Sequence, residues 1–270
     1  MQVLLATVTR RCKRSYMFNN IYLDHCFNED QGFSFYKRLE KLGFILDPLT
    51  VEHPGKAFCR FIILNSNNPR KKFYLEFANI GKGGKHENRP GLSFGYKNNL
   101  ERFSQSLAGK IKTKYDHKNY DWKNNSKDRL PGWNFLLFPK SAIRSILVWV
   151  TEYEPHVKKF KKIIVPKHPN SVYAIHGISL VLTPAGKIHM ESVTGKKLGR
   201  KNKMSDGTFL YIKEGKKNKF ENIILKCHSL QKLLKFSKEK ETIEFEGNTA
   251  LSIKSKHPNP RMWDLLIFQG

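Results

Sequence analysis

Two ionisable residues stand in stretches of the sequence that otherwise read as buried strands. Glu76 lies inside the apolar run from Phe73 to Ile80, and His25 lies in the alternating stretch from Ile21 to Phe27. Burying a carboxylate is costly unless it is paired with a cation or bound to a metal. A histidine on a strand is more often a hydrogen-bonded residue of the core than a ligand, but an imidazole and carboxylates that meet in space can bind a divalent metal.

The elements that must position these residues form a βαβββ pattern between residues 20 and 80. The first strand, from Ile21 to Phe27, precedes a short amphipathic helix that begins after the N-cap candidate Asp30 and ends at Gly43. The three strands that follow are expected at residues 45–51, 57–64 and 72–80. Turn sequences rich in Pro, Gly and Asn separate these strands.

The same order of elements recurs along the chain, although the copies share little sequence identity. A second copy is expected at residues 92–98, 99–107, 132–138 and 145–154, with the helix at 99–107. A third copy begins with a strand at Val172 to Leu182, but the sequence through Gly207 is too rich in Gly, Lys and Thr to predict a helix. A fourth copy is expected at residues 220–227, 229–236, 242–246, 250–254 and 263–268, with the helix at 229–236.

This pattern predicts an α+β fold of tandem βαβββ units that form curved, cupped mixed sheets. The four units are expected to form two pairs, at residues 19–158 and 159–270, the second pair being the more degenerate. Within each pair, two sheets would face each other around a cavity. Residues 1–18 are expected to be an extension outside the fold, because their apolar residues precede the basic ones, which is the wrong order for a signal peptide, and Met17 could be the true start.

Four sequence features resemble the glyoxalase-like branch of the vicinal oxygen chelate superfamily. They are Leu23-Asp24-His25 on the first strand, Leu42-Gly43-Phe44 at the helix end, the turn His53-Pro54-Gly55, and Tyr74-Leu75-Glu76-Phe77 on the fourth strand. The resemblance extends from residue 21 to about residue 182. It implies that the first and fourth strands of a unit lie side by side, so that His25 and Glu76 point into one cavity.

The resemblance also implies a metal site. His25, Glu76 and Glu152, which holds the corresponding position in the second unit, would be the ligands, and Glu152 would also be catalytic. Glu154 replaces Glu152 if the strand register is shifted by two residues. One imidazole and two carboxylates suit Fe(II), Mn(II), Ni(II), Zn(II) or Mg(II) and leave positions open for a chelating substrate. Phe94 stands where relatives with a complete set carry His or Gln, so a fourth protein ligand is not expected.

Two further residues are expected to bind the substrate. His53 matches the family's turn and could reach the mouth of the cavity, with a plain turn role as an equal alternative. Arg60 lies among apolar neighbours on the third strand and would meet an anionic substrate. His176 occupies the place of His25 in the third unit, but only Asp264 offers an acidic partner, so a second metal site is disfavoured.

The implied activity is that of a metal-dependent lyase, isomerase or dioxygenase acting on a small oxygen-rich molecule. The alternative is a non-catalytic protein that binds and sequesters a small molecule on the same fold. A homodimer is left open. We find no GxSxG, HExxH or phosphate-loop motif that would indicate a competing chemistry.

The bulk composition narrows the partners and the compartment. No apolar run is long enough to span a membrane. The formal net charge of +26 would attract polyanions, but the lysines are spread along the chain and no nucleic-acid-binding motif accompanies them, so nucleic acid is disfavoured as a partner. The four cysteines have no metal-site or disulfide spacing, which favours a reducing cytoplasm.

Overall fold

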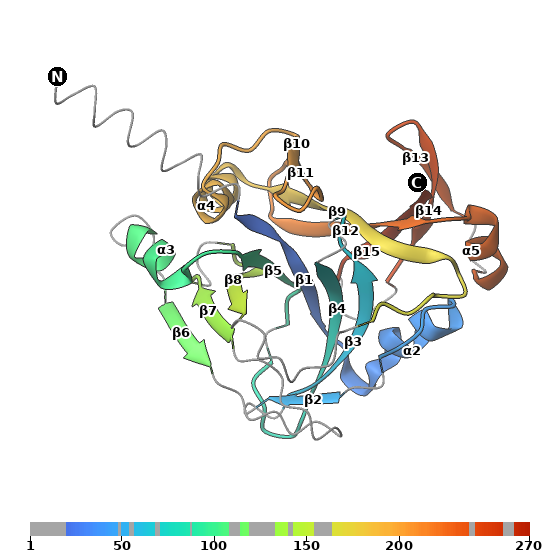
Figure 1. The fold of residues 1–270 in the computed structure, drawn as a ribbon, viewed down its shortest axis with the longest axis horizontal. Coiled ribbons are helices and arrows are strands. Elements are labelled where there is room, and N and C mark those ends of the chain that lie inside the picture. The colour runs from blue at the N-terminus through green and yellow to red at the C-terminus, as the bar shows by residue number, and fades with distance from the viewer. Residues whose placement is uncertain are drawn as a thin grey trace.

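A computed structural model shows one mixed sheet of 15 strands with helices packed around it (Figure 1). The structure describes residues 20–47, 50–53, 57–67, 71–86, 88–107, 114–118, 133–139, 143–153, 164–237, 241–255 and 262–270. We call residues 20–153 the first half and residues 164–270 the second half. None of the helices in these described ranges is long and apolar enough to cross a membrane.

The first half contains two units in chain order. Its elements are β1 (Ile21–Glu29), the 3-10 helix η1 (Gln31–Phe33), α2 (Ser34–Lys41), β2 (Thr50–His53), β3 (Ala57–Asn65), β4 (Lys72–Ile80), β5 (Gly91–Tyr96), α3 (Leu100–Leu107), β6 (Lys114–Lys118), β7 (Trp133–Leu137) and β8 (Leu147–Tyr153). Strand β1 pairs in parallel with β4 and antiparallel with β5, and β5 pairs in parallel with β8. The strands from β6 to β3 therefore curve in one arc (Figure 1).

The second half repeats this hydrogen-bonding scheme. Its elements are β9 (Val172–Leu182), α4 (Pro184–Thr194), β10 (Lys201–Lys203), β11 (Phe209–Glu214), β12 (Lys219–Cys227), α5 (Leu230–Phe236), β13 (Thr242–Phe245), β14 (Asn248–Ile253) and β15 (Asp264–Gln269). Strand β9 pairs in parallel with β11 and antiparallel with β12, and β12 pairs in parallel with β15. The tandem architecture is thereby confirmed, except that the third unit, which the structure describes throughout residues 172–214, has only two strands, β10 and β11, after its helix. The expected boundary between the pairs, at residue 158, falls outside the described residues.

Two details of the predicted elements need correction. Helix α4 was not predicted, yet its ends carry ordinary signals: the Thr183 side chain accepts a hydrogen bond from Gly186 N, Pro184 occupies the first turn, and Gly195 ends the helix at φ 71°. In place of the strand expected at residues 45–51, the structure has β2 at Thr50–His53, and residues 45–47 are not in a strand.

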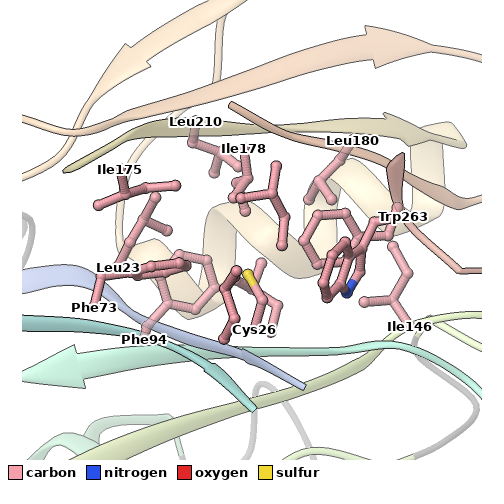
Figure 2. Packing of buried hydrophobic residues seen from close by; sticks show 14 of the residues in the cluster. Leu23, Cys26, Phe73, Phe94, Ile146, Ile175, Ile178, Leu180, Leu210 and Trp263 are labelled. Atoms are coloured by element: carbon pink, nitrogen blue, oxygen red, sulfur yellow. The ribbon is translucent and has the colours of Figure 1, made fainter. Parts of the chain in front are cut away.

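One hydrophobic core joins the two halves. Each central strand turns alternate apolar residues toward it, and Figure 2 shows Leu23 and Phe94 of the first half facing Ile178 and Leu210 of the second half. Trp263 is fully buried in this core. The halves also share a strand contact, because Asn65 of β3 pairs with Ala174 of β9. We call the side of the strands that faces away from this core the open face of each half.

Candidate functional site

A β-bulge in β1 brings two polar residues to the open face of the first half. Leu23 pairs with Phe94, and His25 pairs with the preceding residue Ser93, so Asp24 is the extra residue of the bulge. Leu23 and Cys26, on either side of the bulge, both lie in the core. A bulge of this kind re-aims side chains, and here it places Asp24 and His25 next to each other.

His25 lies between two carboxylates. Its Nδ1 is 2.9 Å from Asp24 Oδ2, and its Nε2 is 3.1 Å from Glu76 Oε2. All three residues are buried, and the Tyr153 hydroxyl donates a further hydrogen bond of 2.8 Å to Asp24 Oδ2. A hydrogen-bonded row thus crosses the sheet from Tyr153 on β8, through Asp24 and His25 on β1, to Glu76 on β4.

The row sets the protonation state of His25. Burial alone would lower the pKa of the imidazole, but the hydrogen bonds and negative charges of Asp24 and Glu76 outweigh it and raise the pKa to about 9. His25 is therefore an imidazolium at neutral pH that donates from both nitrogens. Cys59 also hydrogen-bonds Glu76, and burial raises the pKa of this thiol well above its usual value, so Cys59 stays protonated.

Aromatic side chains surround the row on the open face. The Trp149 ring meets the His25 ring edge to face at 5.0 Å between centroids and also contacts Phe27 at 6.5 Å. On the β3 and β4 side, Phe61 and Tyr74 contact each other at 6.3 Å. Phe27, Phe61 and Tyr74 remain partly exposed. The buried polar row therefore lies beside an apolar surface that solvent still reaches.

The second unit contributes hydroxyl groups where the first contributes His25 and Glu76. Glu76 pairs with the residue two positions after His25, and Thr151 pairs with Gly95, two positions after Ser93. Ser93 and Thr151 are thus the counterparts of His25 and Glu76. Their hydroxyl oxygens are 2.9 Å apart.

The expectation for Glu152 is corrected by its contacts. Its carboxylate accepts hydrogen bonds from Leu100 N at 3.2 Å, at the start of α3, and from Asn134 Nδ2 at 3.1 Å. Side chains alternate along a strand. Thr151 therefore points to the open face of β8, and Glu152 points to the opposite side, toward the start of α3. Phe94 likewise lies in the core, and the position opposite His25 is Ser93. Glu154 lies outside the described residues.

Arg60, one of the two predicted substrate-binding residues, is not brought to the row. Arg60 points away from the open face of β3. Its guanidinium stacks 5.0 Å from the Phe33 ring centroid and donates a hydrogen bond to Thr50 Oγ1 at 3.3 Å. Phe61, its neighbour, is the residue that pairs with Glu76. His53 ends β2, pairing with Ala57, and its side chain lies outside the described part of the chain.

The donor set decides whether a resident divalent metal fits. Within the described residues, no three His, Cys, Asp or Glu side chains are grouped so as to hold a metal ion. Both nitrogens of His25 are engaged by carboxylates, whereas a ligating imidazole must be neutral with a free lone pair. The groups that face it from the second unit, Ser93 and Thr151, are neutral hydroxyls, which are weak ligands beside carboxylate and imidazole. The described residues therefore do not fit the three-ligand site that the sequence led us to expect.

The corresponding region of the second half is aromatic. His176 contacts the rings of Phe209 and Phe268, each at 5.0 Å between centroids, and its Nε2 is 2.8 Å from the Tyr211 hydroxyl. Asp264 instead accepts a hydrogen bond from Ser255 N at 2.9 Å. The acidic neighbour of His176 is Glu246, whose Oε2 lies 3.6 Å from His176 Nε2.

The fold was compared with known proteins. No protein-family model and no curated protein matches the sequence. Among solved structures, a hypothetical protein from Staphylococcus aureus has a TM-score of 0.52 at 11% identity, covering 92% of this chain and 99% of that one. Homoprotocatechuate 2,3-dioxygenase from Arthrobacter globiformis has a TM-score of 0.53 at 12% identity, covering 93% of this chain and 79% of that one.

A third similar structure is 2,2',3-trihydroxybiphenyl 1,2-dioxygenase from Sphingomonas wittichii strain RW1. It has a TM-score of 0.50 at 9% identity and covers 93% of this chain and 91% of that one. Identities this low establish the fold and leave the activity open. The chain therefore shares its overall fold with these two dioxygenases.

Proposed function

We propose that the open face of the first half binds a small oxygen-rich molecule and transfers a proton on it, with His25 as hydrogen-bond donor and Glu76 as base. The observation that carries this proposal is the 3.1 Å contact between His25 Nε2 and Glu76 Oε2, with Asp24 on the other nitrogen. An imidazolium and a carboxylate held this close form an acid and base pair whose members can act on neighbouring atoms of one substrate.

The reaction follows from the geometry of the pair. A substrate carbonyl oxygen replaces Glu76 as the acceptor of the His25 Nε2 proton, while Asp24 keeps the imidazolium in place. The freed carboxylate of Glu76 then removes a proton from the carbon next to the carbonyl, and the electron pair of the broken C–H bond forms an enolate. The hydrogen bond from His25 stabilises the negative oxygen. Where the attacked carbon carries a hydroxyl group, Glu76 returns the proton to the former carbonyl carbon and the hydroxyl proton passes to the other oxygen, which completes an isomerisation. Where a leaving group stands on the carbon next to the attacked one, the enolate electron pair expels it, which completes a lyase reaction.

The aromatic side chains supply the binding energy for the rest of the molecule. Phe27, Phe61 and Tyr74 are partly exposed beside the buried row, and Trp149 covers one side of His25. Small-molecule sites typically combine such apolar contacts with a few placed polar groups. A compact substrate with an apolar or planar part and a carbonyl or adjacent hydroxyl fits this arrangement.

The test is exchange of carbon-bound hydrogen for solvent deuterium. A panel of small 2-oxo and 2-hydroxy compounds is incubated with the protein in D₂O and followed by NMR. Glu76→Gln should slow exchange by roughly 100-fold or more, the usual contribution of a general base. Glu221→Gln is the matched control, because Glu221 is also a hydrogen-bonded carboxylate, held by Ser179 and Lys213, but lies in the second half. Equal exchange by wild type and Glu76→Gln would reject the proposal.

The alternative is a protein that binds a small molecule without reacting it. It is favoured by the two donors that engage Glu76, His25 and Cys59, because a carboxylate with satisfied hydrogen bonds is a weaker base. Chemical-shift changes at the aromatic residues without any exchange would support it. Metal analysis of untagged protein distinguishes the proposed proton transfer and the binding-only alternative from a metal-dependent enzyme. A metal-dependent enzyme requires bound metal that is lost in His25→Ala and Glu76→Ala.

A further inference from the structure

The open face of the second half interleaves lysine with aromatic residues. On the β10–β11 hairpin, Lys201 pairs with Tyr211 and Lys203 pairs with Phe209, so all four side chains lie on the same face. The Lys201 ammonium lies 4.4 Å from the centroid of the Phe209 ring. The alternate residues of β11, Leu210 and Ile212, are buried in the core, which fixes the aromatic residues on the open face.

This face is open to solvent over several residues. Lys201, Lys203 and Lys213 are exposed, and Phe209, Tyr211 and Phe245 are only partly buried. Ile243, on the neighbouring hairpin, is 41% exposed. Apolar and aromatic groups left uncovered on a sheet are typical of an interaction surface.

Lysines predominate among the charged residues of this face. Lys213 lies on the same side of β11 as Phe209 and Tyr211, because these residues alternate with the core residues Leu210 and Ile212. Lys219 is exposed at the start of β12 and pairs with Val181, which is also the partner of Lys213. Two of the lysines have acidic partners on the same face, Lys201 with Glu246 and Lys213 with Glu221. The excess of lysine makes the face a complement to a polyanion.

We propose that this face binds single-stranded nucleic acid, with the lysines contacting phosphates and the aromatic rings stacking on bases. Both components are the ones that non-specific single-strand binding uses: a positive surface along the backbone and flat side chains that accept any base. A duplex would hide its bases from the rings. A partner that presents only negative charges would contact the lysines but not the aromatic rings.

The test is fluorescence anisotropy of a labelled 15-nucleotide oligo-dT with the full chain, over a range of salt concentrations. Replacing two exposed lysines, Lys203→Gln with Lys219→Gln, should reduce the slope of log K against log salt by about 1.4, the value expected for two single-strand phosphate contacts. Phe245→Leu keeps an apolar residue but removes a stacking ring, and it should weaken binding roughly tenfold. The matched control is Lys37→Gln with Lys41→Gln on α2, which removes the same charge elsewhere and should leave the affinity unchanged.

Three outcomes overturn the proposal. They are absence of binding at low salt, equal binding of an abasic strand or of polyphosphate, and equal binding of phosphatidylserine vesicles. Thermal unfolding of each variant shows whether it is folded, and a folded Phe245→Leu that binds like wild type also counts against stacking. His25→Gln should bind oligo-dT normally, which keeps this test independent of the reaction proposed for the first half.

Discussion

His176 should make the protein sensitive to acid. Its side chain is only 9% exposed. The rings of Phe209 and Phe268 contact it, and within the described residues its Nδ1 is a buried atom without a hydrogen-bond partner. Burial, followed by the positive charge of Lys226, lowers the pKa of His176 to about 4, although Glu246 at 3.6 Å acts in the opposite direction.

The sign and size of the effect follow from the two pKa values. In the unfolded chain the imidazole titrates near pH 6.5, so between pH 6.5 and 4 the unfolded state binds a proton that the folded state does not. The free energy of unfolding therefore falls as the pH drops through this window. A shift from 6.5 to about 4 corresponds to a loss of about 3 kcal/mol, complete below pH 4.

The assay is urea unfolding of wild type and His176→Phe at pH 7, 6, 5 and 4. Carboxylates remote from His176 contribute equally to both proteins and cancel in the difference, and Glu246 is the one described carboxylate that contacts the replaced side chain. Wild type should lose about 3 kcal/mol more than His176→Phe between pH 7 and 4. The absolute stability of the variant does not matter, because only the change with pH is compared. A difference between the two proteins that stays constant over this range would refute the reasoning.

Three further predictions concern the protonation of His25, the hydrogen bonds that Asp30 accepts at the start of α2, and the close backbone contact at Gly177. Between pH 6.5 and about 9 the stability of wild type should fall as His25 loses its proton, by up to about 3 kcal/mol, and His25→Gln measured in urea should lack this decline. Asp30→Ala should cost at least about 2 kcal/mol in urea unfolding, because the fully buried carboxylate accepts from the amides of Phe35 and Tyr36 at the start of α2; Asp30→Asn should lose less. Gly177→Ala should lower the melting temperature by several degrees or prevent folding, since its Cβ would lie 2.3 Å from the Phe209 carbonyl oxygen; a variant as stable as wild type would show that the strands separate easily.

Most strands could be predicted because local sequence determines them. The stretch at residues 72–80, for example, contains an apolar run and is bounded by turn residues, and β4 spans Lys72–Ile80 in the structure. The sequence predicts the first helix from Asp30 and Gly43. Gly43 adopts φ 79° just after α2, as expected, whereas the N-cap position of α2 is Phe33, and Asp30 accepts hydrogen bonds from the Phe35 and Tyr36 amides across the intervening 3-10 helix. The superfamily resemblance then supplied the parallel pairing of β1 with β4 that places His25 beside Glu76.

The prediction of the site residues failed where it depended on which side of a strand faces the open face. On β8 the residues from Val148 to Thr151 are all buried, so the sequence does not alternate and does not reveal which side is open. The sequence predicts Glu152 at the position where the structure has Thr151, and a shift of one residue moves a side chain to the opposite face. The bulge that turns Asp24 toward His25 was also missed. Bulges depend on the partner strand, so the sequence of β1 alone does not show one.

The two halves use one hydrogen-bonding scheme but no longer share a site. In β9 a bulge at His176 corresponds to the one at Asp24, since Ile175 and Gly177 pair with adjacent residues of β12. Gly177 therefore takes the place of His25, and Tyr211, which pairs two positions later, takes the place of Glu76.

A glycine and a phenol at these two positions provide neither the imidazolium nor the carboxylate that the proton transfer requires. Ile224, which pairs with Gly177, stands where Ser93 faces His25. Each replacement exchanges a polar group for an apolar or aromatic one, so the second half has an open face that can stack and pack but not move protons. The proposed proton transfer then depends on the first half alone, and Glu76→Gln should slow it by roughly 100-fold or more, with no remaining contribution from the second half.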